Sequence, residues 1–212
     1  MAMLSEDFVR QFKAERASAV LRTDDRQAAR RAMEAAVRGG FRIVEFTLTV
    51  PGAFELIEEF AARSDLVVGA GTVLSGDQAH QAVRAGASFL VSPVVDEAMI
   101  DAASALGVAA MPGCSTPTEM LRAHEAGAPL QKLFPEQATG PSWVKQTLGP
   151  MPFLNIVPTA GVTLGNAADY LRAGAAAVGF VNSLFDPEDI AREDWRAIEH
   201  RAAEMLRAVR PT

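Results

Sequence analysis

Residues 84–112 read RAGASFLVSPVVDEAMIDAASALGVAAMP, and this stretch decides the fold. It holds the short apolar run Phe89–Pro93, then a longer segment with helical spacing, then a second apolar run at Val108–Pro112. Gly86 and Gly107 come just before the two runs, and a glycine past a helix end can adopt the left-handed conformation that stops the helix. The stretch therefore predicts one strand–helix–strand unit.

The same unit repeats along the chain in both directions. Glycines that would end helices recur roughly one βα unit apart, at Gly39, Gly86, Gly107, Gly127, Gly149 and Gly174, except near Arg63-Ser64-Asp65, where polar residues replace the glycine. Eight apolar runs are expected to be strands: Ala19–Arg22, Ile43–Leu48, Leu66–Thr72, Phe89–Pro93, Val108–Pro112, Leu130–Pro135, Ile156–Thr159 and Val178–Asn182. Most of them lack polar–apolar alternation, as expected of parallel strands buried on both faces.

Eight such units close most simply into a (β/α)₈ barrel, and we expect residues 1–212 to form it as a single domain. Met1–Ser18 is predicted to be a leading helix and Glu188–Arg210 a closing one. A doubly wound open sheet is the alternative. It would normally carry a glycine-rich dinucleotide fingerprint after the first strand, and Arg22-Thr23-Asp24-Asp25 does not provide one.

The composition excludes several classes of function. The net charge is −6, and no basic run interrupts this acidic balance, so nucleic acid is not an expected partner. No apolar run approaches the roughly 20 residues needed to cross a bilayer, and the N-terminus does not resemble a signal peptide. Cys114 is the only cysteine, which suits a reducing compartment. We therefore expect a cytoplasmic protein with a small-molecule partner and no membrane association.

No metal site is predicted. His80, His124 and His200 all lie in helical stretches, which form the outer ring of a barrel, and no His/Asp/Glu cluster has metal-ligand spacing. Cys114 follows a predicted strand end without a histidine close in sequence. We interpret it as a small packing residue.

Lys132 is the first candidate for chemistry, because lysine is so rare in this chain. Only Lys13, Lys132 and Lys145 occur, and Lys132 alone lies inside an apolar strand. A buried ammonium is unfavourable unless it is paired or loses its proton, and a neutral amine is a nucleophile for carbonyls. Two structural alternatives stay open: a stem that carries the ammonium out to solvent, or one half of an ion pair.

Glu45 is the second candidate, again a lone charge among strand residues. The two-residue period of a strand places Ile43, Glu45 and Thr47 on one face. If Glu45 and Lys132 both point into the barrel, they form either a buried ion pair or a general acid–base beside an imine-forming amine. Lone charges of opposite sign in two buried strands favour the functional interpretation.

These residues belong to motifs that resemble a known family, the 2-keto-3-deoxy-6-phosphogluconate (KDPG) aldolases, also called 4-hydroxy-2-oxoglutarate (KHG) aldolases. The likeness runs from about Ala19 to Phe185, and the order of the motifs on successive strand ends is highly specific. The motifs are Val44-Glu45-Phe46-Thr47-Leu48-Thr49, Gly69-Ala70-Gly71-Thr72-Val73, Val91-Ser92-Pro93, Met111-Pro112-Gly113, Lys132-Leu133-Phe134-Pro135 and Val157-Pro158-Thr159-Ala160-Gly161-Val162.

The resemblance implies a role for each matching residue. Lys132 matches the Schiff-base lysine and Glu45 the general acid–base, with no cofactor. Many members bind the substrate carboxylate with an arginine where this chain has Thr49; others use an arginine at the end of the first strand, which Arg22 matches. The remaining matches in the keto-acid pocket are Thr72, expected to bind the carboxylate, Phe134, expected to pack on the pyruvyl group, and Pro93 and Thr159.

The phosphate site of the family is altered in this chain. The family has paired glycines after strand seven and Gly-Ser after strand eight, whereas this chain has Ala160-Gly161 and Asn182-Ser183. Gly161 and Ser183 still match substrate-binding positions. Ala160 adds a Cβ where backbone N–H groups would approach a phosphate. The sequence therefore leaves open whether the substrate is phosphorylated.

The resemblance predicts a class I aldolase of carbohydrate metabolism, of the Entner–Doudoroff type. It would cleave a KDPG- or KHG-type 2-keto acid to pyruvate and an aldehyde, as a homotrimer. The first alternative is a related barrel for unphosphorylated 4-hydroxy-2-keto acids. The others are a non-covalent sugar-phosphate epimerase or isomerase, which would need paired acids or metal ligands at strand ends, and a barrel that only binds an anionic metabolite.

Overall fold

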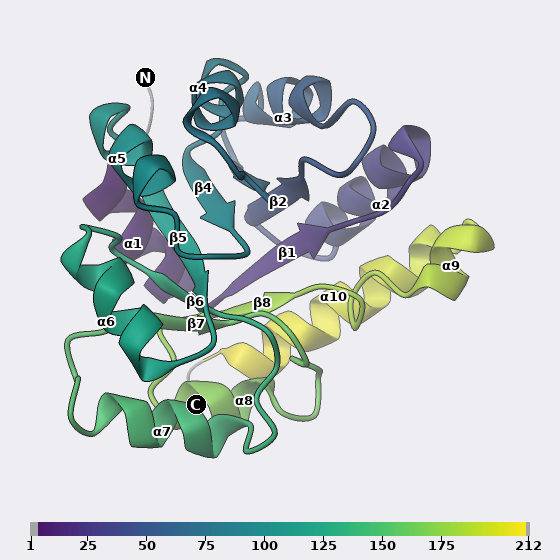
Figure 1. The fold of residues 1–212 in the computed structure, drawn as a ribbon. Coiled ribbons are helices and arrows are strands. Elements are labelled where there is room, and N and C mark those ends of the chain that lie inside the picture. The colour runs from purple at the N-terminus through teal and green to yellow at the C-terminus, as the bar shows by residue number, and fades with distance from the viewer. Residues whose placement is uncertain (1–3, 211–212) are drawn as a thin grey trace.

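The computed structural model describes residues 4–210 and alternates strands with helices along the chain (Figure 1). The strands are β1 Ala17–Leu21, β2 Ile43–Thr47, β3 Val67–Gly71, β4 Phe89–Ser92, β5 Ala109–Cys114, β6 Gln131–Leu133, β7 Ile156–Pro158 and β8 Val178–Phe180. The helices are α1 Ser5–Glu15, α2 Arg26–Arg38, α3 Ala53–Ala61, α4 Gly76–Arg84, α5 Glu97–Ala105, α6 Pro117–Glu125, α7 Pro141–Leu148, α8 Ala167–Arg172, α9 Pro187–Ala191 and α10 Trp195–Val209.

The strands form one parallel sheet that curls into a nearly closed barrel. Its order is β7-β6-β5-β4-β3-β2-β1-β8, and every paired neighbour runs parallel. The sheet ends at β7 and β8, which contact each other; there the N–H of Ala176 donates to the carbonyl of Ile156 at 2.9 Å. The predicted (β/α)₈ barrel is confirmed, and the open doubly wound sheet is excluded.

All eight predicted strands are present, but several ends differ. β1 begins at Ala17 rather than Ala19, because α1 ends at Glu15 and Arg16 turns the chain with a left-handed backbone (φ 63°). The predicted closing helix is wrong as a single helix: α9 and α10 are separated at Glu193, whose φ is +54°. Asp194 then caps α10 by accepting a hydrogen bond from the N–H of Ala197 at 3.0 Å. The first residues of the predicted leading helix, 1–3, lie outside the described residues.

Most of the recurring glycines end helices as predicted. The left-handed backbone is adopted by Gly40, Gly86, Gly107, Gly127 and Gly174. Gly39 is an exception: its φ is −67°, and the next residue, Gly40, takes the left-handed backbone instead. Gly149 is a second exception, with a right-handed φ of −52°. A loop of several residues follows Gly149 before β7, so the chain does not have to turn sharply there.

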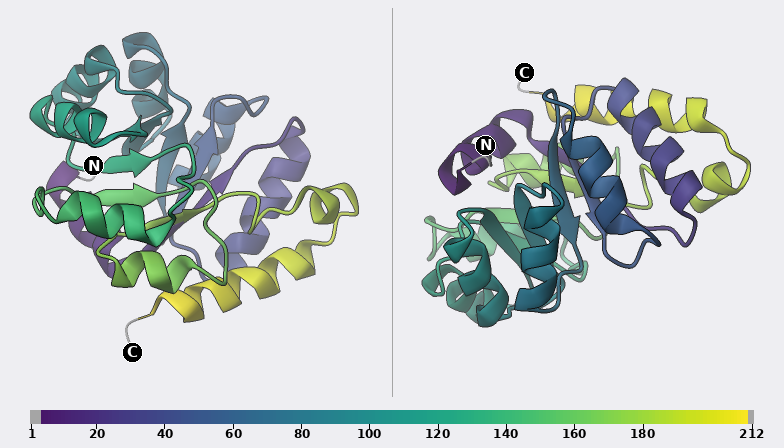
Figure 2. Two further views of the ribbon diagram at one scale, coloured as in Figure 1. Left: turned by 60° about the horizontal axis from the view of Figure 1, so that its bottom comes forward. Right: turned by 90° about the horizontal axis from the view of Figure 1, so that it is seen from above.

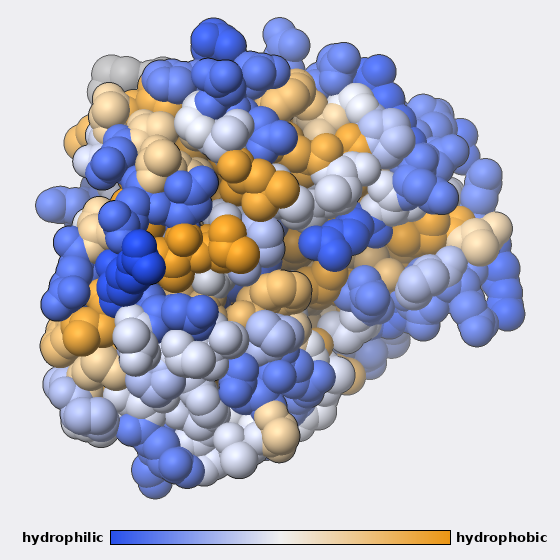
Figure 3. Space-filling view, in the orientation of Figure 1, coloured by the Kyte–Doolittle hydropathy of each residue, from blue (hydrophilic) through white to orange (hydrophobic). Residues whose placement is uncertain are grey.

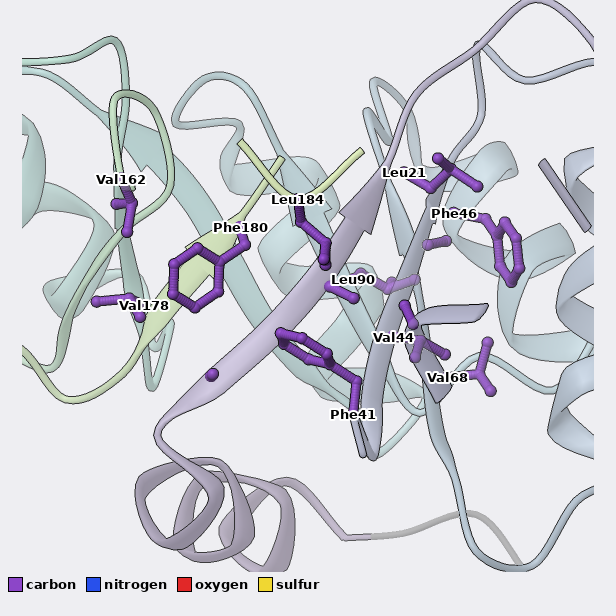
Figure 4. Packing of buried hydrophobic residues seen from close by; sticks show 14 of the residues in the cluster. Leu21, Phe41, Val44, Phe46, Val68, Leu90, Val162, Val178, Phe180 and Leu184 are labelled. Carbon is purple, nitrogen blue, oxygen red and sulfur yellow. The ribbon is translucent and has the colours of Figure 1, made fainter. Parts of the chain in front are cut away.

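Strand residues that point outward form the layer between the sheet and the helices. Val44, Phe46, Leu90 and Phe180 belong to this layer and lie around the outside of the strands (Figure 4). Helix α10 packs against both α2 and α8, so the last helix joins the first barrel helix and completes the outer ring. Outward-facing strand positions are thereby used for packing, and only inward positions remain for chemistry.

Inward-pointing residues fill the lumen at the end where the strands begin. Ile43, Phe89, Leu130 and Val157 form this second apolar cluster together with residues of α1. Helix α1 contacts both β1 and β5 and lies at the end from which the strand arrows point away (Figure 2). The lumen is therefore closed at its N-terminal end, and polar inward residues are found towards the C-terminal ends of the strands.

Candidate active site

Glu45 and Lys132 both point into the lumen, above the apolar cluster. Each follows an inward-facing apolar residue by two positions, Ile43 on β2 and Leu130 before β6, so the strand period carries both charges to the same side. Glu45 is 0% exposed and Lys132 8% exposed. The structure therefore places the two charges predicted from sequence in the same barrel interior.

The Glu45 carboxylate is buried without a hydrogen-bond partner among the described residues, at either oxygen. It lies against Gly71 on β3, where a Cβ atom would overlap Oε1, so glycine is needed at that position. Burial raises the pKa of Glu45 above its ordinary value of 4.5, against the opposing attraction of Lys132 and Arg22. A carboxyl group with a raised pKa can both accept and return a proton near neutral pH.

Burial also lowers the pKa of Lys132 below its ordinary value of 10.5; Glu45 opposes this shift and Arg22 adds to it. The Nζ atom lies 5.2 Å from the centre of the Phe134 ring. A stem that carries the ammonium into solvent does not fit a side chain this buried. A structural ion pair does not fit either, because Glu45 makes no hydrogen bond to it. Burial thus makes the neutral amine form of Lys132 easier to reach than in an exposed lysine.

A cavity of about 390 Å³ opens above Lys132 at the C-terminal ends of the strands. Six of the nine residues predicted from sequence line it: Arg22, Lys132, Phe134, Thr159, Gly161 and Ser183. Lys132 lies on β6, and the others lie in the segments that follow β1, β6, β7 and β8. Strand ends that are distant in sequence therefore meet around one small space, the size of site that a small metabolite requires.

The other three do not line this cavity: Glu45 is buried in the lumen, and Thr72 and Pro93 are placed differently again. Thr72 lines a neighbouring, larger cavity of about 910 Å³, which shares Arg22 with the first. Its backbone is left-handed, with φ +59°, which is uncommon for a β-branched residue and costs on the order of 1–3 kcal/mol. Pro93 lines neither cavity. Its backbone packs instead against Gly113 on β5, where a Cβ atom would overlap it.

Two lumen residues were not singled out from the sequence as site candidates. Thr47 lines the cavity, and its hydroxyl donates to the carbonyl of Leu21 at 3.2 Å. Ser18 is buried beside Thr159, with Gly179 between them, and neither hydroxyl has a partner among the described residues. The available signal was the strand period: Thr47 is two residues from Glu45, and Ser18 is a lone hydroxyl in an apolar strand.

The other candidates have no part in this cavity. The three histidines are exposed on helices, as predicted. Cys114 is 1% exposed, and burial, with a smaller contribution from Glu119, raises the pKa of its thiol to about 12, which makes it a packing residue. Within residues 4–210, no group of His, Cys, Asp and Glu could hold a metal ion. In the same range, no helix is long and apolar enough to cross a membrane.

Comparison with known proteins gives consistent matches. The sequence model of the KDPG and KHG aldolase family matches residues 9–201. A probable 2-dehydro-3-deoxy-6-phosphogalactonate aldolase from Rhizobium meliloti is 36% identical over 80% of this chain and 81% of its own. A 2-dehydro-3-deoxy-phosphogluconate aldolase from Pseudomonas aeruginosa is 33% identical over 82% and 80%.

Among solved structures, the chain is similar to the KDPG aldolase from Legionella pneumophila. That structure holds pyruvate captured at low pH as a covalent carbinolamine intermediate. The TM-score is 0.84 at 28% identity, and the match covers 93% of this chain and 97% of the other.

Proposed function

The chain belongs to the KDPG and KHG aldolase family, and from this premise we propose that Lys132 and Glu45 carry its reaction. It is a class I aldolase, a lyase that cleaves KDPG- or KHG-type 2-keto acids through a Schiff base to pyruvate and an aldehyde. The observation that carries the residue assignment is the pair itself. Two opposite charges are buried in one lumen, and within the described part of the chain the carboxylate has no hydrogen-bond partner.

The reaction starts at Lys132. Its neutral amine attacks the C2 carbonyl of the 2-keto acid, and loss of water leaves a protonated imine. Glu45 then takes the proton from the C4 hydroxyl, directly or through a water. The electrons of the broken O–H bond form the second bond of the aldehyde carbonyl, and the electrons of the C3–C4 bond move into the imine to give an enamine. The same carboxyl returns its proton to C3, and hydrolysis of the resulting imine releases pyruvate and regenerates the amine.

Other residues position the keto acid. Arg22 stands at the end of β1 on the cavity wall, where its guanidinium can hold the substrate carboxylate with two hydrogen bonds. Phe134 lies beside the Lys132 amine and is suited to pack on the pyruvyl group. Thr159 lines the same wall, and we assign it to substrate contact. Thr72, which lines the neighbouring cavity together with Arg22, is assigned to the carboxylate, and Pro93 to the support of this wall.

The two other readings of the barrel have less support. A non-covalent epimerase or isomerase needs paired acids or a metal at the strand ends, and the cavity wall between Arg22 and Ser183 provides a lysine instead. A barrel that only binds an anion has no use for a carboxylate buried beside the amine, because the carboxylate weakens anion binding and destabilises the fold.

Borohydride trapping with pyruvate tests the assignment. We expect one reduced pyruvyl group per chain, located on Lys132 by peptide mass spectrometry, and neither trapping nor cleavage in Lys132→Ala. Lys145→Ala is the matched control, because Lys145 is exposed on α7 and its variant should label normally. A label on Lys13 or Lys145 of the wild-type protein contradicts the assignment.

We also propose a homotrimer working in the cytoplasm, in carbohydrate breakdown of the Entner–Doudoroff type. Apolar side chains exposed on the surface support self-association: Leu74 and Val94, each 52% exposed, follow the adjacent strands β3 and β4. Figure 3 shows apolar residues exposed between hydrophilic ones on one face of the molecule. Light scattering on the purified protein should give three times the chain mass, and a monomer would contradict the trimer.

A further inference from the structure

Arg22, the residue assigned to the substrate carboxylate, stands one position beyond the end of β1. The pairing of β1 with β2 ends at Leu21, which lies opposite Phe46, and both side chains face outward into the helix layer (Figure 4). The two-residue period then turns Arg22 inward, where it lines the cavity above Lys132 and the larger cavity beside it. Its side chain is long and exposed. The backbone at the end of β1 therefore decides the direction in which this side chain leaves the strand.

Thr47 fixes the peptide group between Leu21 and Arg22. From the end of the neighbouring strand β2, its hydroxyl donates to the carbonyl of Leu21 at 3.2 Å. A peptide group is planar, so a bond to its carbonyl oxygen also orients the nitrogen of Arg22. Thr47 is 2% exposed, so water does not compete for this bond as it would at the surface. The buried hydroxyl is thus placed to set the starting direction of the arginine side chain.

A second hydroxyl supports the first. The chain turns back after β2, where the N–H of Val50 donates to the carbonyl of Thr47 at 2.9 Å, and this turn brings the hydroxyls of Thr47 and Thr49 to 2.8 Å. A hydroxyl has one hydrogen, and that of Thr47 is engaged with Leu21, so Thr49 donates and Thr47 accepts. Although Thr47 lines the cavity, its hydrogen is therefore not available to a substrate.

We propose that Thr47 is a positioning residue for Arg22, and that it directs the guanidinium at the substrate carboxylate. It acts through its bond to the carbonyl of Leu21, which the hydroxyl of Thr49 supports. This inference rests on the proposed function, because it takes Lys132 as the point to which the keto acid is bound and Arg22 as the group that holds its carboxylate. A residue in this role should change KM and spare kcat, since the reacting groups keep their places.

The test uses pyruvate alone, in heavy water. The imine on Lys132 loses a C3 proton to Glu45, which exchanges it with the solvent and returns a deuteron to C3, so proton NMR follows the loss of the methyl signal. Thr47→Val keeps the shape of the side chain but removes the hydroxyl. KM for pyruvate should rise about fivefold to tenfold, and kcat should stay within about threefold of wild type. Thr47→Ser restores the hydroxyl and should return KM to within about twofold of wild type.

A double-mutant cycle separates positioning of Arg22 from direct contact with the substrate. Arg22→Leu alone should raise KM, because the carboxylate loses its charged partner. If Thr47 acts through Arg22, adding Thr47→Val to Arg22→Leu should raise KM by less than about twofold further. A hydroxyl that contacts pyruvate itself would instead raise KM by the same factor whether or not the arginine is present.

Two further threonines provide a second variant and a control. Thr49 is exposed, so Thr49→Val should fold normally, and loss of its supporting bond should raise KM about twofold. Thr118→Val is the matched control: Thr118 is exposed on α6, and the same substitution there should leave KM and kcat unchanged. A thermal unfolding curve for each variant shows whether the fold is retained.

Borohydride trapping of pyruvate on the same preparations separates the two proposals. If Lys132 is labelled and Thr47→Val keeps the KM of wild type, or raises it equally with and without Arg22, the positioning role is overturned and the proposed function stands. A fall in kcat at unchanged KM overturns the role as well. If Thr47→Val does not fold, the same cycle with Thr49→Val decides, and an unchanged KM in that variant overturns the role. If Lys132 is not labelled, the proposed function fails, and the inference fails with it.

Discussion

The two ends of the barrel lumen differ in the polarity of the side chains buried there. At the end where the strands begin, Phe8 of α1 stacks on Phe89 of β4 at 4.4 Å, and Phe12 packs beside it. All three rings are fully buried, and the cluster around them is apolar. At the other end, Glu45 and Lys132 are buried almost as deeply, and the carboxylate has no hydrogen-bond partner among residues 4–210.

The difference separates stability from function within one interior. We call the end where the strands begin the lower end and the end with Glu45 and Lys132 the upper end. Each large apolar side chain buried at the lower end contributes about 1.5–3 kcal/mol to the stability of the fold. Each unsatisfied polar group at the upper end opposes folding by about 1–3 kcal/mol. The lower end therefore supports a fold in which the upper end can hold charges in the unfavourable state that catalysis uses. Mutations at the two ends should move activity and stability in different directions.

The largest effect is expected from Lys132→Met, which removes the amine but keeps an unbranched side chain of similar length. Cleavage should fall on the order of 10⁴-fold or more, because among residues 4–210 no other lysine lines the cavity to form the imine. The pKa of Lys132 is lowered in the fold, so the unfolded chain holds its proton more tightly, and the lysine opposes folding below pH 10.5. The variant should thus be at least as stable as wild type in urea at neutral pH.

Lys145→Met, on the exposed face of α7, is the control for this variant and should leave both quantities unchanged. Loss of stability in Lys132→Met would show that the lysine is part of the packing, and the contrast between the two ends would then be wrong.

Glu45→Gln should have the next largest effect: turnover should fall by about 10²–10⁴-fold while pyruvate is still trapped. The amide keeps the shape of the carboxyl group but cannot shuttle a proton. Turnover and trapping are measured on the same sample. Near-normal turnover would make Glu45 a structural neighbour of Lys132 and nothing more.

The difference in stability between Glu45→Gln and wild type should depend on pH. Because the folded pKa of Glu45 is raised above 4.5, the unfolded state loses its proton first as pH increases, and wild type becomes less stable between pH 4.5 and the folded pKa. Glutamine does not titrate. The unfolding free energy of the variant should therefore match wild type below pH 4.5 and exceed it increasingly above, by about 1.4 kcal/mol per unit of pKa shift. A constant difference across this range would contradict the shift.

Phe8→Ala tests the lower end, where the expected loss is in stability. Truncation of a fully buried aromatic ring costs about 3–5 kcal/mol. At a temperature where the variant stays folded, kcat should remain within a few-fold of wild type, because the ring is far from the cavity. Leu4→Ala, at the 63% exposed start of the same helix, should change stability by no more than about 0.5 kcal/mol. Lost kcat in folded Phe8→Ala would show that the two ends are coupled.

The smallest effect is expected from Arg22→Leu at the rim of the upper end. Loss of one charge-assisted contact to the substrate carboxylate should reduce transition-state stabilisation, measured from kcat/KM, by about 1.5–3 kcal/mol for every 2-keto acid. Arg31→Leu is the control: Arg31 lines only the neighbouring cavity, where it pairs with Glu193 at 3.1 Å. Unchanged pyruvate capture in Arg22→Leu would exclude this role.

Much of the fold follows from local patterns. The eight strands are predictable because continuous apolar runs, each bounded by a turn or by a glycine with a left-handed backbone, have few other stable conformations. The two central residues are predictable for the same reason: Glu45 and Lys132 are lone charges in segments whose other residues demand burial. These signals depend only on neighbours along the chain, and the sequence by itself determined them.

Tertiary structure decided what depends on distant segments meeting. The break between α9 and α10 and the opening between β7 and β8 are set by packing against other elements. Thr72 and Pro93 share motifs with the site residues but lie off its cavity, since direction at a strand end depends on the loop that follows. Glu136 meets Gly161 only because two loops converge over the barrel. A residue's partners there are set by the closed sheet, which no local pattern encodes.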